Sequence, residues 1–181
     1  MIVKEFEIEG LRLFEPRIFH DDRGFFYESY NEEKYGEFIG REIRFVQDNI
    51  STSAKGVLRG LHFQAPPFAQ GKLVSVIKGK VLDVAVDIRK GSPTYGKHQV
   101  IELSAKNKLQ FWIPPGFAHG FLSFEEDTVF SYKCSNYYSP SHERTLLWSD
   151  ADLGIEWGMS DPIVSEKDKI GEVFLNFASP F

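Results

Sequence analysis

Apolar and polar residues alternate along most of this chain in short runs, which is the pattern of β-strands that turn one face inward. In the clearest run, residues 80–88, Val84 and Val86 occupy one face while Asp83 and Asp87 occupy the other. Glycine, proline and charged residues separate the runs and mark turns. Similar runs predict strands at residues 2–14, 45–50, 56–64, 73–77, 98–103, 109–113, 119–124 and 129–134.

Helical patterns are few and short. Residues 31–38 have helical spacing, but Gly36 and Gly40 limit any helix there. Ser165 and Asp168 have the spacing of a capping box and predict a helix start. Many short strands without a long amphipathic helix indicate an all-β fold, and we expect a jelly-roll β-barrel with short peripheral helices.

The connection at Lys78-Gly79 joins two predicted strands, residues 73–77 and 80–88, through very few residues. Such a short connection between two apolar runs predicts a β-hairpin in which the two strands pair.

With 181 residues, of which 42% are hydrophobic, the chain suits one globular domain over residues 1–181. Its formal net charge of −5 makes nucleic acid a poor partner, although a few cations could hold a small anion. Cys134 is the only cysteine, so no internal disulfide can form. We expect a cytoplasmic protein without a membrane segment, because no long apolar run is present.

His62 lies within the run GVLRGLHFQ, residues 56–64. Alternation places Leu58 and His62 on one face and Arg59 on the other, so the imidazole is expected to point where a core residue would be. A lone inward histidine is usually structural, with one hydrogen bond. The nearby Lys72 favours a second interpretation, in which this run forms the wall of an active site.

Two further polar groups accompany this run. Residues 47–49, Gln-Asp-Asn, supply hydrogen-bonding side chains just before it, which favours a ligand over a packed core. Earlier, residues 20–28 predict a turn and an aromatic strand, with Arg23 and Glu28 on either side of two phenylalanines. The alternative for this segment is simply a charged hairpin end.

The positions of His62 and His119 resemble the two signature segments of the cupin superfamily, whose small barrels usually hold a metal. A metal-binding cupin would place another histidine at Gln64 and a glutamate near Pro67 and Phe68. Two histidines alone make a weak site, because a catalytic metal is normally held by three protein ligands. We therefore expect no metal and no cofactor.

A narrower resemblance covers nearly the whole chain, and it rests on several motifs in a fixed order. Together these resemble the dTDP-4-dehydrorhamnose 3,5-epimerase family. The resemblance implies a metal-free cupin, usually a homodimer, that inverts C3 and C5 of a dTDP-linked 4-keto-6-deoxyhexose on the way to dTDP-L-rhamnose. The motifs are DDRGFFYE (21–28), FVQDN (45–49), GVLRGLHFQ (56–64), QGKL (70–73), PGFAHGF (115–121) and SEKD (165–168).

The resemblance also implies roles for single residues. The catalytic base falls on His62, its acidic partner on Asp168, the opposing general acid on Tyr132 and the enolate-stabilising lysine on Lys72. The family's substrate-binding positions fall on Arg23, Glu28, Gln47, Asn49, Arg59, His119, Tyr138, Glu143 and Lys167, with Tyr138 stacking on the nucleobase.

These residue types suit the chemistry. A proton on a carbon next to a ketone leaves only if a base removes it while charge on the enolate oxygen is stabilised. Histidine, with an ordinary pKa of about 6.5, suits the base. Tyr132, in a different predicted strand from His62, can lie on the opposite side of the substrate. Each residue also has a structural alternative: Asp168 as a helix cap, Lys72 as a solvated strand end, and Tyr132 as a core aromatic.

Two other functions stay open at this point. One is a single-centre epimerase or a 3,4-ketoisomerase on the same scaffold. The other is a non-catalytic cupin that binds a sugar nucleotide, which would keep Arg59 and Tyr138 but would have no reason to keep His62, Lys72 and Tyr132 together.

Overall fold

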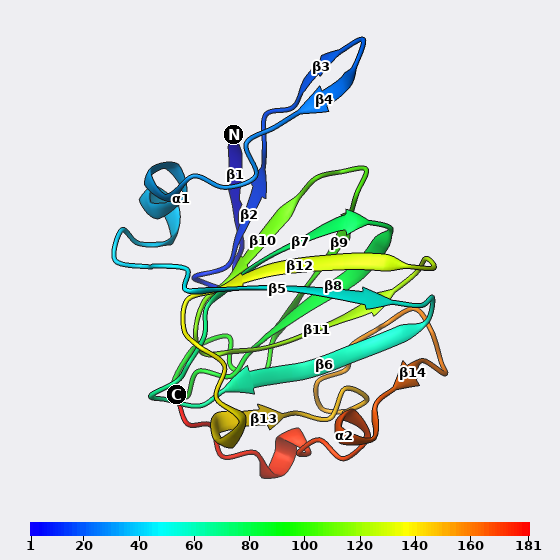
Figure 1. The fold of residues 1–181 in the computed structure, drawn as a ribbon. Helices are drawn as coiled ribbons and strands as arrows, with labels where there is room; N and C mark the ends of the chain where they lie inside the picture. Colours follow the sequence, from blue (N-terminus) through cyan, green and yellow to red (C-terminus); the bar gives the residue numbers. More distant parts are fainter.

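The computed structural model describes residues 1–181 as two β-sheets that face each other, the architecture of a jelly roll (Figure 1). The first sheet has the order β1 (Ile2–Glu5), β2 (Arg12–Glu15), β10 (Gln110–Ile113), β7 (Lys72–Lys78), β12 (Thr128–Cys134) and β5 (Gln47–Ser53). The second has the order β13 (Glu143–Thr145), β6 (Val57–Gln64), β11 (Phe117–Ser123), β8 (Lys80–Asp87) and β9 (His98–Ser104), and β14 (Ile163–Val164) lies parallel to β6. The all-β prediction is confirmed.

The main core lies between the two sheets, and alternation along β8 decides which residues enter it. Val81 and Ala85 belong to the inner core, whereas Val84 and Val86 belong to a second cluster on the outer face of the same sheet. The alternation predicted for residues 80–88 is therefore confirmed. Aromatic residues of the inner core include Phe111, Phe117, Phe121 and Phe130.

The chain ends cover the outer faces of the barrel. Helix α1 (Glu32–Ile39) packs Tyr35 with Phe14, Leu73 and Trp112 on the first sheet. The C-terminal segment packs Trp157 and Phe177, among other residues, against the second sheet. This segment contains α2 (Glu166–Lys169) and the 3-10 turn η2 (Phe174–Asn176), and a further 3-10 turn, η1 (Pro140–His142), precedes β13.

The predicted hairpin around Lys78-Gly79 is wrong. Strands β7 and β8 follow each other directly, yet β7 pairs with β10 and β12 while β8 pairs with β11 and β9. The connection therefore carries the chain from one sheet to the other. Gly79 makes this possible with a φ of 83°, a conformation that side chains rarely adopt.

A β-bulge interrupts β6 next to the site. In the register with β11, His119 faces His62 and Phe121 faces Arg59, so one more residue lies between the partners on β6 than on β11. The extra residue falls at Gly60, whose φ is 143° and whose Cβ, if present, would lie 2.5 Å from Cα of Gly120. Bulges of this kind change the direction in which side chains point.

The bulge corrects one expectation from the sequence. Simple alternation placed Arg59 and His62 on opposite faces of the strand. In the structure both line the same cavity. One extra residue inverts the alternation, so Arg59 joins His62 at the site.

Strands β3 (Phe19–Asp21) and β4 (Gly24–Phe26) form a hairpin that projects away from the barrel (Figure 1). Phe25 and Phe26 in this arm are 54% and 69% exposed. The turn and aromatic strand predicted for residues 20–28 are confirmed. No helix of the chain is both long and apolar enough to span a membrane.

Candidate active site

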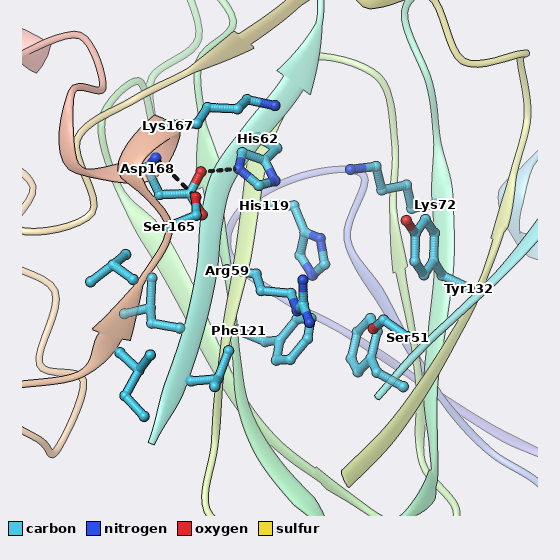
Figure 2. A pocket seen from close by; sticks show the side chains of 15 residues that line it. Ser51, Arg59, His62, Lys72, His119, Phe121, Tyr132, Ser165, Lys167 and Asp168 are labelled. Atoms are coloured by element: carbon cyan, nitrogen blue, oxygen red, sulfur yellow. Dashed lines mark hydrogen bonds and ion pairs between the residues drawn. The ribbon is translucent and has the colours of Figure 1, made fainter. Parts of the chain in front are cut away.

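A cavity of about 450 Å³ opens between the two sheets, and we name it the first lobe (Figure 2). An adjoining cavity of about 300 Å³, the second lobe, shares His62, Lys72 and Tyr132 with it. These three residues therefore lie where the two lobes meet. The first lobe adds Ser51, Arg59, His119, Phe121 and Asp168, among others; the second adds Gln47, Asn49, Phe63, Gln64, Gln70, Tyr138 and Glu143.

His62 and Asp168 form a hydrogen-bonded pair in the first lobe. Nε2 of His62 lies 2.6 Å from Oδ1 of Asp168, whose carboxyl group is almost fully buried. Burial alone would raise the pKa of Asp168, but the hydrogen bond and charge of His62 outweigh it and lower that pKa. The carboxylate is thus ionised, orients the imidazole and stabilises its protonated form.

Asp168 is not the cap of helix α2. The cap is Ser165, whose hydroxyl accepts the backbone N–H of Asp168 at 3.2 Å. In a full capping box the acid would reach back to the capping residue. Here the carboxylate of Asp168 instead accepts the backbone N–H of Gly60 at 3.3 Å and bonds His62. The helix holds Asp168 against β6 and leaves its side chain to the site.

Lys72 begins β7 and extends its ammonium group into the cavity (Figure 2). No hydrogen bond or ion pair with a protein group holds Nζ, which lies 5.9 Å from the ring centre of Tyr132. Burial lowers the pKa of Lys72, because a charged group loses hydration there. An ammonium without a partner in such a site is suited to a ligand oxygen that carries negative charge.

Tyr132 comes from the other sheet and faces His62 across the cavity (Figure 2). Its strand, β12, pairs with β5, and Asn49 lies opposite Tyr132 in that register. Burial raises the pKa of Tyr132. The phenol therefore stays protonated near neutral pH, the state that a proton donor needs.

A second histidine–carboxylate pair lies beside the first. Nε2 of His119 is 2.9 Å and 3.1 Å from the two carboxylate oxygens of Asp83, and both side chains are buried. His119 faces His62 directly in the β11–β6 register. His119 was expected at the site, whereas Asp83 was missed: alternation places it on the inner face of β8 but does not reveal its partner.

Arg59 is fixed by strand β5. Its Nε donates to Oγ of Ser53 and one terminal nitrogen donates to the carbonyl of Thr52, both at 3.1 Å. The other terminal nitrogen remains for a ligand, and its delocalised charge suits an anionic oxygen.

Polar side chains gather at the rim of the second lobe. Glu143 accepts a hydrogen bond from Tyr138 at 2.8 Å and forms an ion pair with Lys167 at 2.5 Å. Gln47 accepts the backbone N–H of Tyr138 at 2.9 Å and donates to Asn49 at 3.0 Å. Five residues expected to bind substrate thus form one connected group.

Arg23 and Glu28 do not join this group. Arg23 lies in the projecting arm, where it pairs with Asp21, and Glu28 pairs with Lys34 at 2.8 Å. Neither lines either lobe. Their role in binding substrate stays a prediction.

The side chain that replaces a metal ligand is already engaged. The amide of Gln64 donates to the carbonyl of Phe68 at 2.7 Å and accepts the backbone N–H of Ser139 at 2.6 Å. The protein has no group of three or more His, Cys, Asp or Glu side chains arranged for a metal ion.

The jelly-roll barrel with a histidine on each of two neighbouring strands, β6 and β11, has the architecture of a cupin. A family model described as dTDP-4-dehydrorhamnose 3,5-epimerase matches residues 5–175. The chain therefore belongs to the dTDP-4-dehydrorhamnose 3,5-epimerase family.

Individual relatives agree with this assignment. Enzymes named dTDP-4-dehydrorhamnose 3,5-epimerase are 53% identical in Shigella flexneri, covering 97% of both chains, and 56% identical in Salmonella typhimurium, covering 93% of this chain and 92% of that one. A crystal structure of an epimerase from Legionella pneumophila in complex with dTDP-4-keto-L-rhamnose has a TM-score of 0.94 at 47% identity, covering 98% of this chain and 94% of that one.

Proposed function

We propose that this protein, as one catalytic domain over residues 1–181, is a dTDP-4-dehydro-6-deoxy-D-glucose 3,5-epimerase. Its product is dTDP-4-dehydro-L-rhamnose, an intermediate of dTDP-L-rhamnose biosynthesis. The observation that carries the proposal is the placement of the His62–Asp168 pair and Tyr132 on opposite walls of one cavity, with Lys72 between them. The named activities of the relatives support it.

His62 is the base. Because Nε2 is bonded to an ionised Asp168, that nitrogen carries the proton and Nδ1 is left to accept one. Nδ1 takes the proton from C3 or C5, and the electron pair of the broken C–H bond moves into the enolate of the C4 ketone. Asp168 then stabilises the imidazolium that results.

Lys72 stabilises the enolate. Its ammonium group has no competing protein partner, and it lies between the walls that hold the base and the acid. A fixed positive charge at the developing oxyanion lowers the barrier more in a cavity than in water, because the local dielectric is lower.

Tyr132 completes the inversion. Its phenol donates a proton to the carbon from the face opposite His62, so the C–H bond forms with reversed configuration. The enolate electrons return to that bond and the C4 ketone is restored. Solvent then removes the proton from His62 and returns one to Tyr132, so the enzyme ends as it began.

The nucleotide occupies the rest of the cavity in this proposal. Tyr138, whose ring is exposed at the rim, stacks on the base while Glu143 and Lys167 hold polar groups beside it. Arg59 contacts the diphosphate with its remaining terminal nitrogen. Gln47, Asn49 and His119 complete the substrate-binding set.

We also propose a homodimer. The arm exposes Phe19, Phe25 and Phe26 to solvent on a hairpin that packs little against its own barrel. A second copy would cover these rings and would bring Arg23 and Glu28 near a ligand that neither reaches within one chain. Sedimentation should give twice the monomer mass, and Arg23→Ala should raise KM; a monomer with wild-type KM for that variant would contradict this.

Proton NMR of the product formed from dTDP-4-keto-6-deoxyglucose in D₂O tests the activity. We expect deuterium at both C3 and C5 and the L-rhamno configuration. Deuterium and inversion at only one carbon would show a single-centre epimerase. Unchanged substrate would leave only a binding protein.

A further inference from the structure

Strand β5 presents an unusual inner face. Gln47, Asn49, Ser51 and Ser53 alternate on the side that faces the cavities, while Ile50 on the outer side is 67% exposed. A strand at a barrel wall normally turns its apolar side chains inward. The reversed pattern indicates that this wall is built to contact a polar ligand.

Three of these four side chains have partners within the protein. Gln47 donates to Asn49 at 3.0 Å, Asn49 donates to Sγ of Cys134 at 3.6 Å, and Ser53 accepts from Arg59 at 3.1 Å. Ser51 is the exception, because its hydroxyl oxygen is shielded from solvent and has no hydrogen-bond partner. A shielded hydroxyl without a partner destabilises the fold, so its presence calls for a role.

Ser51 lies on the wall of the proton donor. Ser51 lies opposite Phe130 in the β5–β12 register, and Asn49, two residues before it on the same face, lies opposite Tyr132. Ser51 also lines the first lobe (Figure 2). Rotation about its single side-chain torsion turns the hydroxyl toward the cavity. A ligand held between His62 and Tyr132 would therefore lie next to Ser51.

The chemistry of the lobe decides what Ser51 can bind. The groups of Lys72 and Arg59 that lack partners can only donate hydrogen bonds, whereas a serine hydroxyl both donates and accepts. Phosphate and ketone oxygens need only donors. A ring hydroxyl of a sugar also needs an acceptor for its own proton, which Ser51 supplies.

We propose that Ser51 binds the C2 hydroxyl of the hexose ring, an inference that rests on the proposed function. The C3 hydroxyl changes direction when C3 is inverted, and the C4 oxygen is assigned to Lys72. The C2 hydroxyl keeps its configuration throughout, so a serine on a rigid strand can hold it from substrate to product. Ser51 thereby fixes the ring while its neighbouring carbons change.

The test compares Ser51→Ala with Ser131→Ala, a serine on the outer face of β12. For Ser51→Ala we expect KM for the keto-sugar nucleotide to rise roughly 3- to 10-fold, the effect of one neutral hydrogen bond, with unchanged Kd for dTDP alone. Its melting temperature should not fall, because the change removes a hydroxyl without a partner. Ser131→Ala should match the unaltered protein in all three.

A substrate without the C2 hydroxyl supplies a second measurement, whose first arm uses the unaltered protein alone. For the unaltered protein, KM should rise by the same factor when this analogue replaces the normal substrate. For Ser51→Ala, KM should be the same with both substrates. Equal weakening of dTDP binding would place Ser51 at the diphosphate and overturn the proposal. If Ser51→Ala has the KM of the unaltered protein, and the analogue has the KM of the normal substrate, the proposal about Ser51 is also overturned. The epimerase proposal would stand as long as the unaltered protein converts its substrate.

Discussion

Asp168 follows His62 by 106 residues, yet its Oδ1 lies 2.6 Å from Nε2 of that histidine. Strand β14 and helix α2 produce this contact, because β14 runs parallel to β6 and the helix after it places Asp168 against the bulge at Gly60. His62 and Asp168 are thus held by two elements that are far apart in sequence and adjacent in space.

Asp168→Asn should separate catalysis from stability. Asparagine can accept the N–H of Gly60 but cannot stabilise an imidazolium, so kcat should fall by roughly 100-fold or more. The melting temperature should fall only modestly: the lowered pKa of Asp168 means that its charge adds some stability, but Ser165 still caps the helix. Glu166→Gln, an exposed change in the same helix, is the control. Near-normal kcat with a lowered melting temperature would leave Asp168 a structural role only.

Lys72→Met should make the protein more stable and much less active. Methionine keeps much of the length but removes a charge that has no partner, so the free energy of unfolding should rise by about 1 kcal/mol. Without the ammonium the enolate is not stabilised, and kcat should fall by more than about 100-fold. Denaturant titration and steady-state kinetics measure the two. A less stable variant with unchanged kcat would contradict both assignments.

The lowered pKa of Lys72 also fixes a pH dependence. Between that pKa and the ordinary value of 10.5, the unfolded chain still holds the proton that the folded protein has lost. Stability from this residue therefore rises with pH across that window, and kcat falls as the ammonium loses its charge. Both slopes should be absent in Lys72→Met.

Asp87 should control stability in acid without affecting catalysis. Its carboxylate is fully buried; burial would raise its pKa, but hydrogen bonds from Arg89, Ser92 and Thr94 lower it from 3.8 to about 2. The stabilisation, about 2 kcal/mol, is present above pH 3.8 and is lost as pH falls through 2. Asp87→Asn should lose this amount at pH 7 and little at pH 2 in denaturant titrations, with unchanged kcat. An equal loss at both pH values would contradict it.

Exhaustive chelation should leave activity unchanged. The protein has no group of three or more His, Cys, Asp or Glu side chains arranged for a metal ion, and the amide of Gln64 is engaged with the backbone, so a third ligand beside His62 and His119 is missing. Metal analysis of the purified protein and kcat after EDTA treatment check this. Stoichiometric zinc, iron or nickel together with EDTA-sensitive turnover would refute it.

Local pattern predicted much of the fold. Alternation identified the strands and assigned the faces of β8, because that strand is regular and one face enters the core. It failed at β6, where one extra residue at the bulge inverted the pattern and moved Arg59 to the side of His62. It also failed at Lys78-Gly79, because a short connection looks the same whether the strands pair or change sheets.

The site was harder to predict from the sequence than the fold was, because its contacts join residues that are far apart in the chain. The contact of His62 with Asp168 depends on long-range strand pairing, which no local pattern encodes, and only the family motifs indicated it. Asp83 and Ser51 were missed because neither stands out in its run. Asp83 matters because it bonds His119 on the neighbouring strand β11, and Ser51 matters because its hydroxyl has no partner in the protein.

We propose that His62 and Tyr132 transfer protons on opposite faces of the substrate. In His62→Ala nothing removes the C3 or C5 proton, so neither exchange nor inversion should occur in D₂O, a loss of at least ~100-fold. In Tyr132→Phe the base and Lys72 remain, so the enolate should still form and take deuterium from the His62 side, returning labelled substrate without inversion.

NMR of the two variants in D₂O gives the ratio of deuterium incorporation to epimerised product, and this ratio distinguishes a base from an acid on the opposite face. We expect no incorporation for His62→Ala and incorporation without inversion for Tyr132→Phe. Inversion at the wild-type rate by Tyr132→Phe, or normal exchange by His62→Ala, would contradict the assignment of the two residues.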